Sequence, residues 1–407
     1  MVWGIVTLRC KFVGTPKTRF ISDKVIGFSA SEGSLLVIFF NNPSNLPNFA
    51  VHQTDNKNRK QSLDMQQLLT TLISIPAISR DEAQKADALE HYMLKQGLHP
   101  QREVNNIWCV GNTFLPNRPT VLLNAHLDTV KPVSGWTRQP HVPTLEGDRL
   151  YGLGTNDCGG GLVALLFAFM QLNNEDDGQL PYNLVYLASA EEEVSGRNGI
   201  ERALPLLPPI DVAIVGEPTG MHPAIAEKGL MVLDCTAHGV SGHAAREEGV
   251  NAIYKAFDDI AWLRTHQFER VSPLLGPVKM SVTQVNAGTQ HNVVPDACTF
   301  VVDVRTNECY SNQQVLDEIA AHLSSDVKAR STRLNSSSIP ETHPLIQRCV
   351  ALGGVPYGSP TLSDQALMAF PSFKLGPGES ARSHTADEFI CLSELECALD
   401  VYLQLLR

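Results

Sequence analysis

The chain has 407 residues, of which 43% are hydrophobic and 18% charged, and its formal net charge is -11. This length exceeds one ordinary core and predicts two or three domains. The acidic balance argues against nucleic acid as a partner, and no apolar run approaches the roughly 18 residues of a membrane span. The nine cysteines include no C-x-x-C pair and indicate reduced core thiols of a cytoplasmic protein.

Residues 1–60 precede the first regular pattern. They lack the charged end, long apolar stretch and small-residue cleavage site of a secretory signal. Met65, Leu68 and Leu72 then recur at helical spacing and predict a helix that begins near Ser62. We interpret residues 1–60 as an N-terminal extension and assign it no role.

Residues 61–225 read as a helix followed by strands that alternate with helices. This alternation predicts an α/β layer with a mostly parallel sheet. GLVALLFAFMQL, residues 161–172, predicts a buried helix opened by glycines. A similar pattern resumes over 338–407, so we expect both segments to form one domain.

Residues 226–337 show a different pattern. Strands are predicted at 228–239, 278–288, 298–307 and 328–337, and amphipathic helices at 251–264 and 312–325. The order β-α-β-β-α-β is the split βαβ arrangement of a ferredoxin-like layer. We therefore expect a smaller α+β domain inserted into the larger one.

Five acidic or imidazole residues stand near the ends of predicted buried strands. His126 follows TVLLNA, Glu193 follows NLVYLASA, Glu217 follows DVAIVG, and His384 comes a few residues after SFKLG, while Asp157 lies in a glycine-rich turn. In open α/β sheets, ligands bind outside the carboxyl ends of the strands. Such residues on one rim predict a metal site, and the site points to hydrolysis.

Each of these motifs also has a simpler interpretation. Asp128 either supports His126, directly or through a backbone group, or is a turn residue after the strand. Asp157 either bridges two cations or caps a glycine-rich turn. The run Glu191–Glu193 either supplies a ligand and a base or is a solvated loop. The glycines are not a phosphate loop, because no G-K-[ST] follows them.

The motifs HLDTV, GTNDCGGG, EEEVSG, VGEPT and GPG…SHT occur in this order. Together they resemble the M20 family of metallopeptidases and amidohydrolases, from about residue 62 to 407. In detail the chain looks most like the acetylornithine deacetylase branch, particularly the Bacteroidetes-type enzymes of arginine biosynthesis. The resemblance implies a zinc-peptidase-like catalytic domain, residues 61–225 and 338–407, with a ferredoxin-like lid and dimerisation domain, residues 226–337, inserted into it.

The resemblance also implies a pair of metal ions and their ligands. Asp157 would bridge two zinc ions, with cobalt as the alternative metal. Glu193 and His384 would complete the shell of one ion, and His126 and Glu217 that of the other. The family often has D-M-K-G-G after the bridging aspartate, whereas this chain has D-C-G-G-G and lacks the lysine.

Catalytic and substrate-binding roles follow from the same resemblance. Glu192 would be the general base, and Asp128 would support the first metal site. His243 would help to bind the carbonyl oxygen in the transition state, in its own site or in that of a dimer partner. Asn292 and Arg305 would hold the substrate, Arg305 through its α-carboxylate.

The expected reaction is hydrolysis of the amide of a small N-acyl amino acid. N-acetyl-L-ornithine is the first candidate, with N-succinyl-L-ornithine and N-acetylcitrulline beside it. The rivals within the family are a dipeptidase, a carboxypeptidase and a succinyl-diaminopimelate desuccinylase. A rival from another class is an inactive metal-binding scaffold, against which the presence of Glu192 argues.

Overall fold

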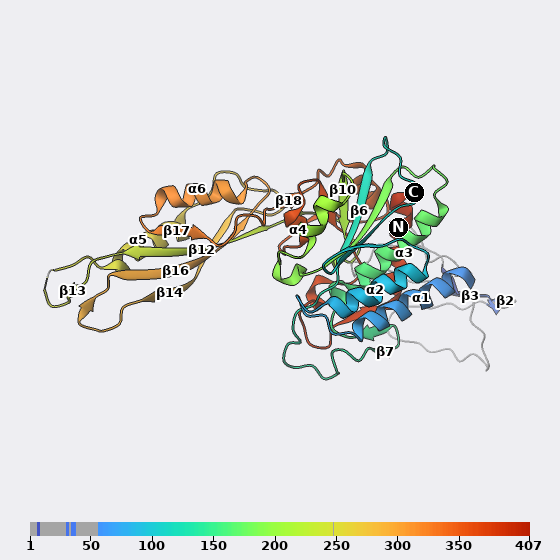
Figure 1. Ribbon diagram of the computed structural model, residues 1–407, viewed down its shortest axis with the longest axis horizontal. Coiled ribbons are helices and arrows are strands. Elements are labelled where there is room, and N and C mark those ends of the chain that lie inside the picture. Colours follow the sequence, from blue (N-terminus) through green and yellow to red (C-terminus); the bar gives the residue numbers. More distant parts are fainter. Residues whose placement is uncertain (1–5, 9–29, 32–33, 38–55, 247) are drawn as a thin grey trace. The chain divides into compact units, whose positions relative to one another are not determined.

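The computed structural model describes residues 6–8, 30–31, 34–37, 56–246 and 248–407 (Figure 1). Their contacts divide the chain into Met1–Lys60 and Gln61–Arg407. The first unit contains a small antiparallel sheet of β1 (Val6–Leu8), β3 (Ser34–Val37) and β2 (Ala30–Ser31), in that order. Most of the extension predicted for residues 1–60 lies outside the described residues.

The first long helix, α1 (Asn56–Ile73), begins earlier than the predicted start at Ser62. The segment before Ser62 contains Lys, Arg and Gln, which are good helix formers, so the helix extends through it. Met65, Leu68 and Leu72 are buried along one face, as their spacing predicted. A second helix, α2 (Ala83–Lys95), follows.

The larger sheet has nine strands and is mixed rather than mostly parallel. Its order is β18 (Ser337–Ser338), β11 (Ala224–Glu227), β20 (Ser372–Lys374), β10 (Val212–Val215), β6 (Thr120–His126), β9 (Asn183–Ser189), β5 (Asn106–Val110) and β4 (Gln101–Glu103), with β19 (Tyr357–Ser359) beside β11. The central strands β20, β10, β6 and β9 are parallel. At one edge, β4 and β5 are joined by a tight turn, and such a connection requires antiparallel pairing.

Side-chain parity distributes the core of this sheet over its two faces. One face packs on α3 (Gly160–Glu175), which also contacts α8 (Leu392–Leu406). On this face the hydroxyl of Tyr186 donates to the carbonyl of Leu162 in α3. On the opposite face, Leu122, Val185 and Val215 cluster with residues of α4 (Ile200–Ala203). The buried helix predicted at 161–172 is therefore confirmed as part of α3.

The remaining short elements complete the larger layer. A three-stranded sheet is formed by β21 (Phe389–Cys391), β8 (Arg149–Tyr151) and β7 (Thr144–Glu146). The other short helices are η1 (Thr155–Gly159), η2 (Glu192–Val194), η3 (Leu204–Leu206), α7 (Pro344–Ala351), η4 (Asp364–Leu367) and η5 (Ser380–Arg382). Among the described residues, no helix is both long enough and apolar enough to cross a membrane.

The segment between β11 and β18 forms a separate antiparallel sheet, which we call the small layer. Its strands lie in the order β14 (Lys279–Ala287), β16 (Ala297–Thr306), β12 (Gly229–His238) and β17 (Asp326–Ala329). With α5 (Ala252–Thr265) and α6 (Asn312–His322), the chain order is the predicted β-α-β-β-α-β. A two-stranded ribbon of β13 (Gly242–His243) and β15 (Val293–Val294) is also present.

The last strand of the small layer differs from the prediction. It covers 326–329 rather than 328–337. After it, the side chain of Asn335 accepts a hydrogen bond from the backbone N–H of Asn312 at the start of α6. The segment therefore leaves the sheet to cap a helix.

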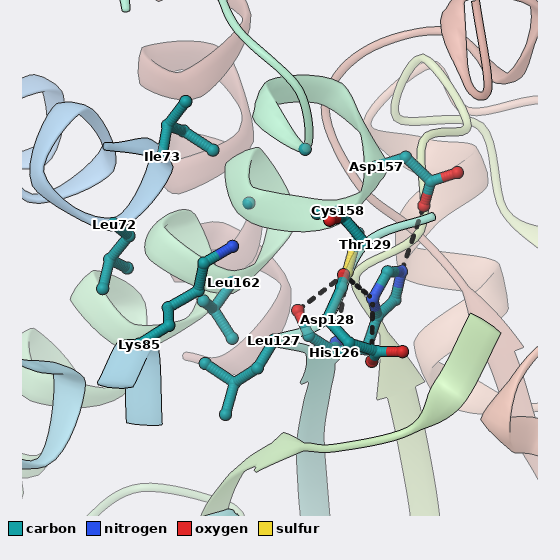
Figure 2. Close-up of a pocket in the computed structure, with 12 residues that line it drawn as sticks. Leu72, Ile73, Lys85, His126, Leu127, Asp128, Thr129, Asp157, Cys158 and Leu162 are labelled. Atoms are coloured by element: carbon teal, nitrogen blue, oxygen red, sulfur yellow. Dashed lines mark hydrogen bonds and ion pairs between the residues drawn. The ribbon is translucent and has the colours of Figure 1, made fainter. Parts of the chain in front are cut away.

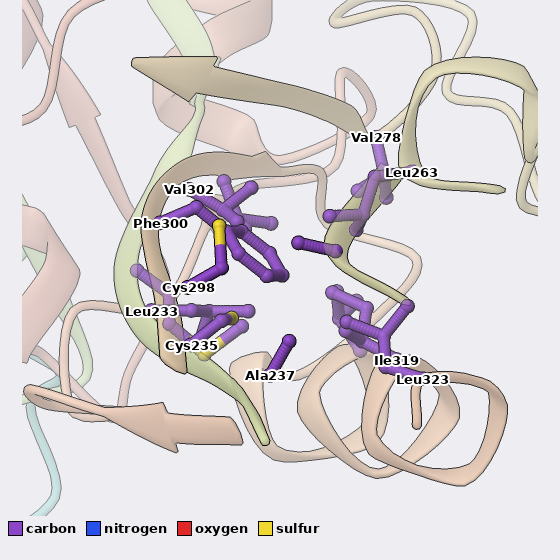
Figure 3. Close-up of a cluster of buried hydrophobic side chains, with 14 of the residues drawn as sticks. Leu233, Cys235, Ala237, Leu263, Val278, Cys298, Phe300, Val302, Ile319 and Leu323 are labelled. Atoms are coloured by element: carbon purple, nitrogen blue, oxygen red, sulfur yellow. The ribbon is translucent and has the colours of Figure 1, made fainter. Parts of the chain in front are cut away.

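A single hydrophobic core lies between the sheet and the helices of the small layer (Figure 3). Every second residue of β12 is buried, Leu233 and Cys235 among them, and Phe300 of β16 joins them. Ala256 of α5 and Ile319 of α6 contribute to the same cluster, so both helices cover one face of the sheet. The cysteines within the described residues are free, and Cys109, Cys158, Cys235, Cys298 and Cys349 among them are buried.

Candidate metal centre

The four parallel strands at the centre of the larger sheet deliver acidic and imidazole groups to one rim. His126 is the last residue of β6. The turn with Glu193 follows β9, Glu217 follows β10, and the segment with His384 follows β20. Because these strands are neighbours in the order β20-β10-β6-β9, their carboxyl ends meet at the same edge.

Asp157 lies between the two imidazoles of this rim. Its Oδ1 is 3.0 Å from Nε2 of His126, and its Oδ2 is 3.5 Å from Nε2 of His384. The same atom of His384 is 2.9 Å from Oε2 of Glu193, and Nε2 of His126 is 3.7 Å from Oε1 of Glu217. The structure thus brings all five predicted ligands together, in two groups that share Asp157.

Asp128 organises the residues around it. Its carbonyl oxygen is 2.9 Å from Nδ1 of His126, whereas its carboxylate is 3.6 Å from that nitrogen. The carboxylate accepts hydrogen bonds from the backbone N–H groups of Glu192 and Glu193 and from the hydroxyl of Ser79. Of the two supporting contacts considered from the sequence, the closer one to His126 is the backbone group.

Glu192 is enclosed at the centre of the cluster. Its Oε2 lies 4.0 Å from Nε2 of His126. Burial, together with the charge of Glu217, raises the pKa of Glu192 well above its ordinary value. A partly buried carboxyl with a raised pKa is the type of group that accepts and returns a proton near neutral pH.

The pKa values of the other members show that the cluster carries surplus negative charge. Burial and the neighbouring Asp157 raise the pKa of Glu217 to about 7. The hydrogen bond to Glu193 raises the pKa of His384 to about 9. Burial acts to lower the pKa of His126, yet the surrounding anions raise it well above its usual value. Bound cations would offset this surplus, and imidazole and carboxylate are ligands that zinc accepts, so the donor set fits metal ions.

A small cavity lies beside His126, lined by residues of α1, α2, β6 and the Asp157 turn (Figure 2). Lys85 of α2 projects into it and is 4% exposed. Burial lowers the pKa of Lys85 to about 8, while Asp128 acts in the opposite direction. Gly159, which stands in the D-C-G-G-G stretch where the family often has lysine, lines the same cavity.

The residues predicted to act from the small layer lie in two places. His243 and Asn292 are exposed neighbours, since β13 pairs with β15 and the N–H of Ala244 donates to the carbonyl of Asn292. Arg305 forms a two-pronged ion pair with Asp303, at 2.9 and 3.1 Å. Within the described part of the chain, no hydrogen bond or ion pair connects these three residues to the metal cluster.

Sequence reasoning missed Ser79, Lys85 and Glu388. Each contacts or faces the centre from a distant segment and stands in no motif that we had singled out. Of the three, Glu388 was the easiest to find from the sequence, because it follows the SHT motif by a few residues.

The sequence profile of Peptidase family M20/M25/M40 matches residues 122–407, which is more than half of the chain. The chain belongs to the M20 family. The matched range contains all five residues of the metal cluster, and the predicted family is confirmed. This M20 chain is therefore a member of a family of hydrolases that depend on metal ions.

Relatives of this M20 chain include deacylases. Acetylornithine deacetylase of Proteus mirabilis is 29% identical over 377 residues, which cover 84% of this chain and 95% of that protein. Succinyl-diaminopimelate desuccinylase of Xylella fastidiosa is 26% identical over 369 residues, covering 83% and 97%. A solved structure of a dinuclear metal-binding M20 peptidase from Bacillus subtilis matches with a TM-score of 0.64 at 16% identity, covering 85% of this chain and 98% of the other. That likeness confirms the M20 peptidase fold, and the lid and dimerisation roles of the small layer stay predictions.

Proposed function

We propose that this M20 hydrolase removes the acyl group from an N-acyl amino acid, with N-acetyl-L-ornithine as the first candidate. N-succinyl-L-ornithine and N-acetylcitrulline are the next candidates, and arginine biosynthesis is the corresponding route. The observation that carries the proposal is Asp157 between His126 and His384, with Glu192, whose side chain is 10% exposed, beside them.

Two zinc ions would be held by this cluster, with cobalt as the alternative metal. Asp157 would bridge them, His126 and Glu217 would complete one shell, and Glu193 and His384 the other. Paired ions of this kind lower the pKa of a water molecule and polarise a scissile amide.

The side chains around the cluster then have separate tasks. Glu192 takes the proton of the attacking water and passes it to the leaving amine. Asp128 holds the backbone of Glu192 in place, because its carboxylate accepts a hydrogen bond from the N–H of Glu192.

We further propose that residues 226–337 act as a lid over the catalytic part, residues 61–225 and 338–407. His243 and Asn292 would then approach the substrate on closure. The guanidinium of Arg305 would take the substrate α-carboxylate by two parallel hydrogen bonds, sharing its charge with Asp303.

A second copy of the chain is the partner proposed for the small layer. Its edge strand β14 is largely exposed, with Val285 at 54%. On the adjacent helix α5, Tyr254 and Phe257 are 70% and 63% exposed. An exposed edge strand beside exposed aromatic side chains is a ready surface for pairing. Light scattering on wild type and on Phe257→Asp tests this, and a monomeric wild type would contradict it.

The relatives support deacylation over peptide hydrolysis, because the deacetylase and the desuccinylase are 29% and 26% identical to this chain, whereas the dinuclear peptidase is 16% identical and shares the fold alone. Acyl preference depends on small pocket differences of about 1–3 kcal/mol per methylene. The dipeptidase, carboxypeptidase and desuccinylase readings therefore stay as rivals.

The test is a hydrolysis assay with zinc present. It compares N-acetylornithine, N-succinylornithine, N-acetylcitrulline, N-succinyl-diaminopimelate and simple dipeptides. We expect cleavage of an N-acyl amino acid by wild type, loss of it in Glu192→Ala, and normal rates in the exposed control Glu341→Ala. Cleavage of dipeptides alone would rule out the deacylase, and equal activity of Glu192→Ala would rule out the base.

A further inference from the structure

The turn that carries Asp157 is held by a carboxylate from a distant part of the chain. Glu388 is 2% exposed, and its carboxylate accepts hydrogen bonds from the backbone N–H groups of Gly154, Asn156 and Asp157, at 3.1, 2.8 and 3.0 Å. Its carbonyl oxygen also accepts from the N–H of Gly152 at 2.9 Å. Glu388 therefore accepts hydrogen bonds from most of the backbone N–H groups of the turn that carries Asp157.

The contact is reciprocal. The side-chain oxygen of Asn156 accepts from the N–H of Glu379, at 3.0 Å. Its side-chain nitrogen donates to the carbonyl of Glu379 and to the hydroxyl of Ser383. The segment 379–388 and the turn 152–157 thus hold each other from both sides.

The segment that supplies Glu388 also supplies His384, and its backbone is strained between the two. His384 and Asp387 have φ values of 58° and 55°, in the left-handed region that side chains seldom adopt. Such strain persists only where the surroundings impose it, and it is frequent at functional sites. In this conformation the imidazole of His384 lies near Oδ2 of Asp157. The carboxylate of Glu388 reaches the backbone N–H groups of the turn that carries Asp157.

We infer that Glu388 is a positioning residue for the bridging ligand Asp157, acting through backbone amides rather than on a metal or substrate. The inference rests on the proposed metal centre, but not on the identity of the substrate. Because Asp157 belongs to both groups of ligands, loss of the hydrogen bonds between the turn and Glu388 weakens the binding of both ions together.

Two conservative variants test this inference. Glu388→Gln keeps the shape but can present an oxygen to only one side, so its –NH2 group faces at least one backbone donor. Glu388→Asp keeps the charge but is one methylene too short to reach all of the amides. The matched control is Glu341→Gln, the same substitution at an exposed glutamate outside the segment 379–388.

The measurements are zinc affinity by chelator competition and the visible spectrum of the cobalt-loaded protein, both without substrate. We expect Glu388→Gln to lose about 10–100-fold in affinity for both ions, as is usual when a group that orients a ligand is removed. The cobalt bands should shift in this variant, and Glu388→Asp should be intermediate. Glu341→Gln should stay within about twofold of wild type.

Wild-type affinity and an unchanged cobalt spectrum in Glu388→Gln would overturn the inference. If that variant does not fold, Glu388→Asp decides, since a folded Glu388→Asp with wild-type affinity and spectrum overturns it equally. A wild type that binds metal but cleaves no N-acyl amino acid would instead remove the proposed function and leave this inference standing.

Discussion

The carboxylate of Asp128 accepts a hydrogen bond from the backbone N–H of Glu192, at 3.0 Å. The same carboxylate accepts from the next amide, that of Glu193. A residue that supports His126 therefore also sets the positions of the proposed base and of a ligand of the other ion.

Replacement of Asp128 by Asn should disturb both halves of the centre. The amide nitrogen of Asn cannot accept from a backbone N–H, so one of the two contacts is lost. We expect kcat/KM on the cleaved substrate to fall about 10–100-fold. Ser79→Ala removes only the hydroxyl donor to the same carboxylate and should change kcat/KM a few-fold at most. An Asp128→Asn enzyme as active as wild type would contradict the assigned role.

Metal stoichiometry should distinguish the bridging ligand from a terminal one. His384 contacts only the group with Glu193, whereas Asp157 contacts both imidazoles. We expect His384→Ala to retain about one zinc equivalent of two after dialysis, and Asp157→Ala to retain neither. Elemental analysis of the dialysed proteins measures this, with wild type as reference. Equal loss in the two variants would remove the shared-ligand arrangement.

Lys85→Met should stabilise the metal-free protein. Burial lowers the pKa of Lys85 to about 8, so its charged form costs stability below that pH. Between pH 8 and the ordinary value of 10.5 the unfolded chain binds more protons, and wild-type stability rises with pH. We expect Lys85→Met to gain roughly 1–3 kcal/mol at pH 7, and less as the pH approaches 10.5.

Urea denaturation of chelator-treated protein measures this difference. Lys95→Met, at an exposed position of the same helix, is the control and should stay within about 0.5 kcal/mol of wild type. A Lys85→Met protein that is less stable than wild type at pH 7 would show that the amine is a net stabilising partner.

Gly161→Ala should displace Glu217. A Cβ at Gly161 would lie 1.8 Å from the carbonyl oxygen of Gly216, the residue before Glu217, so α3 and the end of β10 would have to separate. We expect a loss of stability of about 1–3 kcal/mol with weaker zinc binding. Gly111→Ala is the control, because its nearest atom would be at 3.3 Å. Thermal melts with and without zinc measure both effects, and a Gly161→Ala protein that melts and binds zinc like wild type would contradict the packing argument.

Much of the fold was predictable because it depends on local pattern. Alternation predicted β12 and β16, and helical spacing predicted α5 and α6. The rim of the larger sheet was predictable because polar residues interrupt apolar runs where His126 and Glu217 stand. The spacing of apolar and polar residues that makes these predictions is visible within a few positions of the chain.

What the sequence did not predict depends on contacts between distant segments. Lys85 looks like an ordinary surface lysine of an amphipathic helix, and only the packing of α2 against β5, beside the cavity that Lys85 shares with His126, encloses it. Glu388 looks like a loop residue until the turn of Asp157 is placed over it. The predicted start of α1 and the predicted end of β17 were wrong for a different reason. The ends of helices and strands depend on capping and on contacts with neighbouring backbone.

The pairing of Glu193 with His384 joins residues 191 positions apart, with the whole small layer between them. The entropy of closing such a loop grows only slowly with its length, so a large insertion there is tolerated. Four of the five proposed ligands precede the insertion and only His384 follows it, so the group around Glu193 is completed only when the segment after the insertion has docked. Metal ions bound at that stage would connect the segments of the catalytic layer before and after the insertion. Metal binding would therefore stabilise only those chains in which both segments have docked.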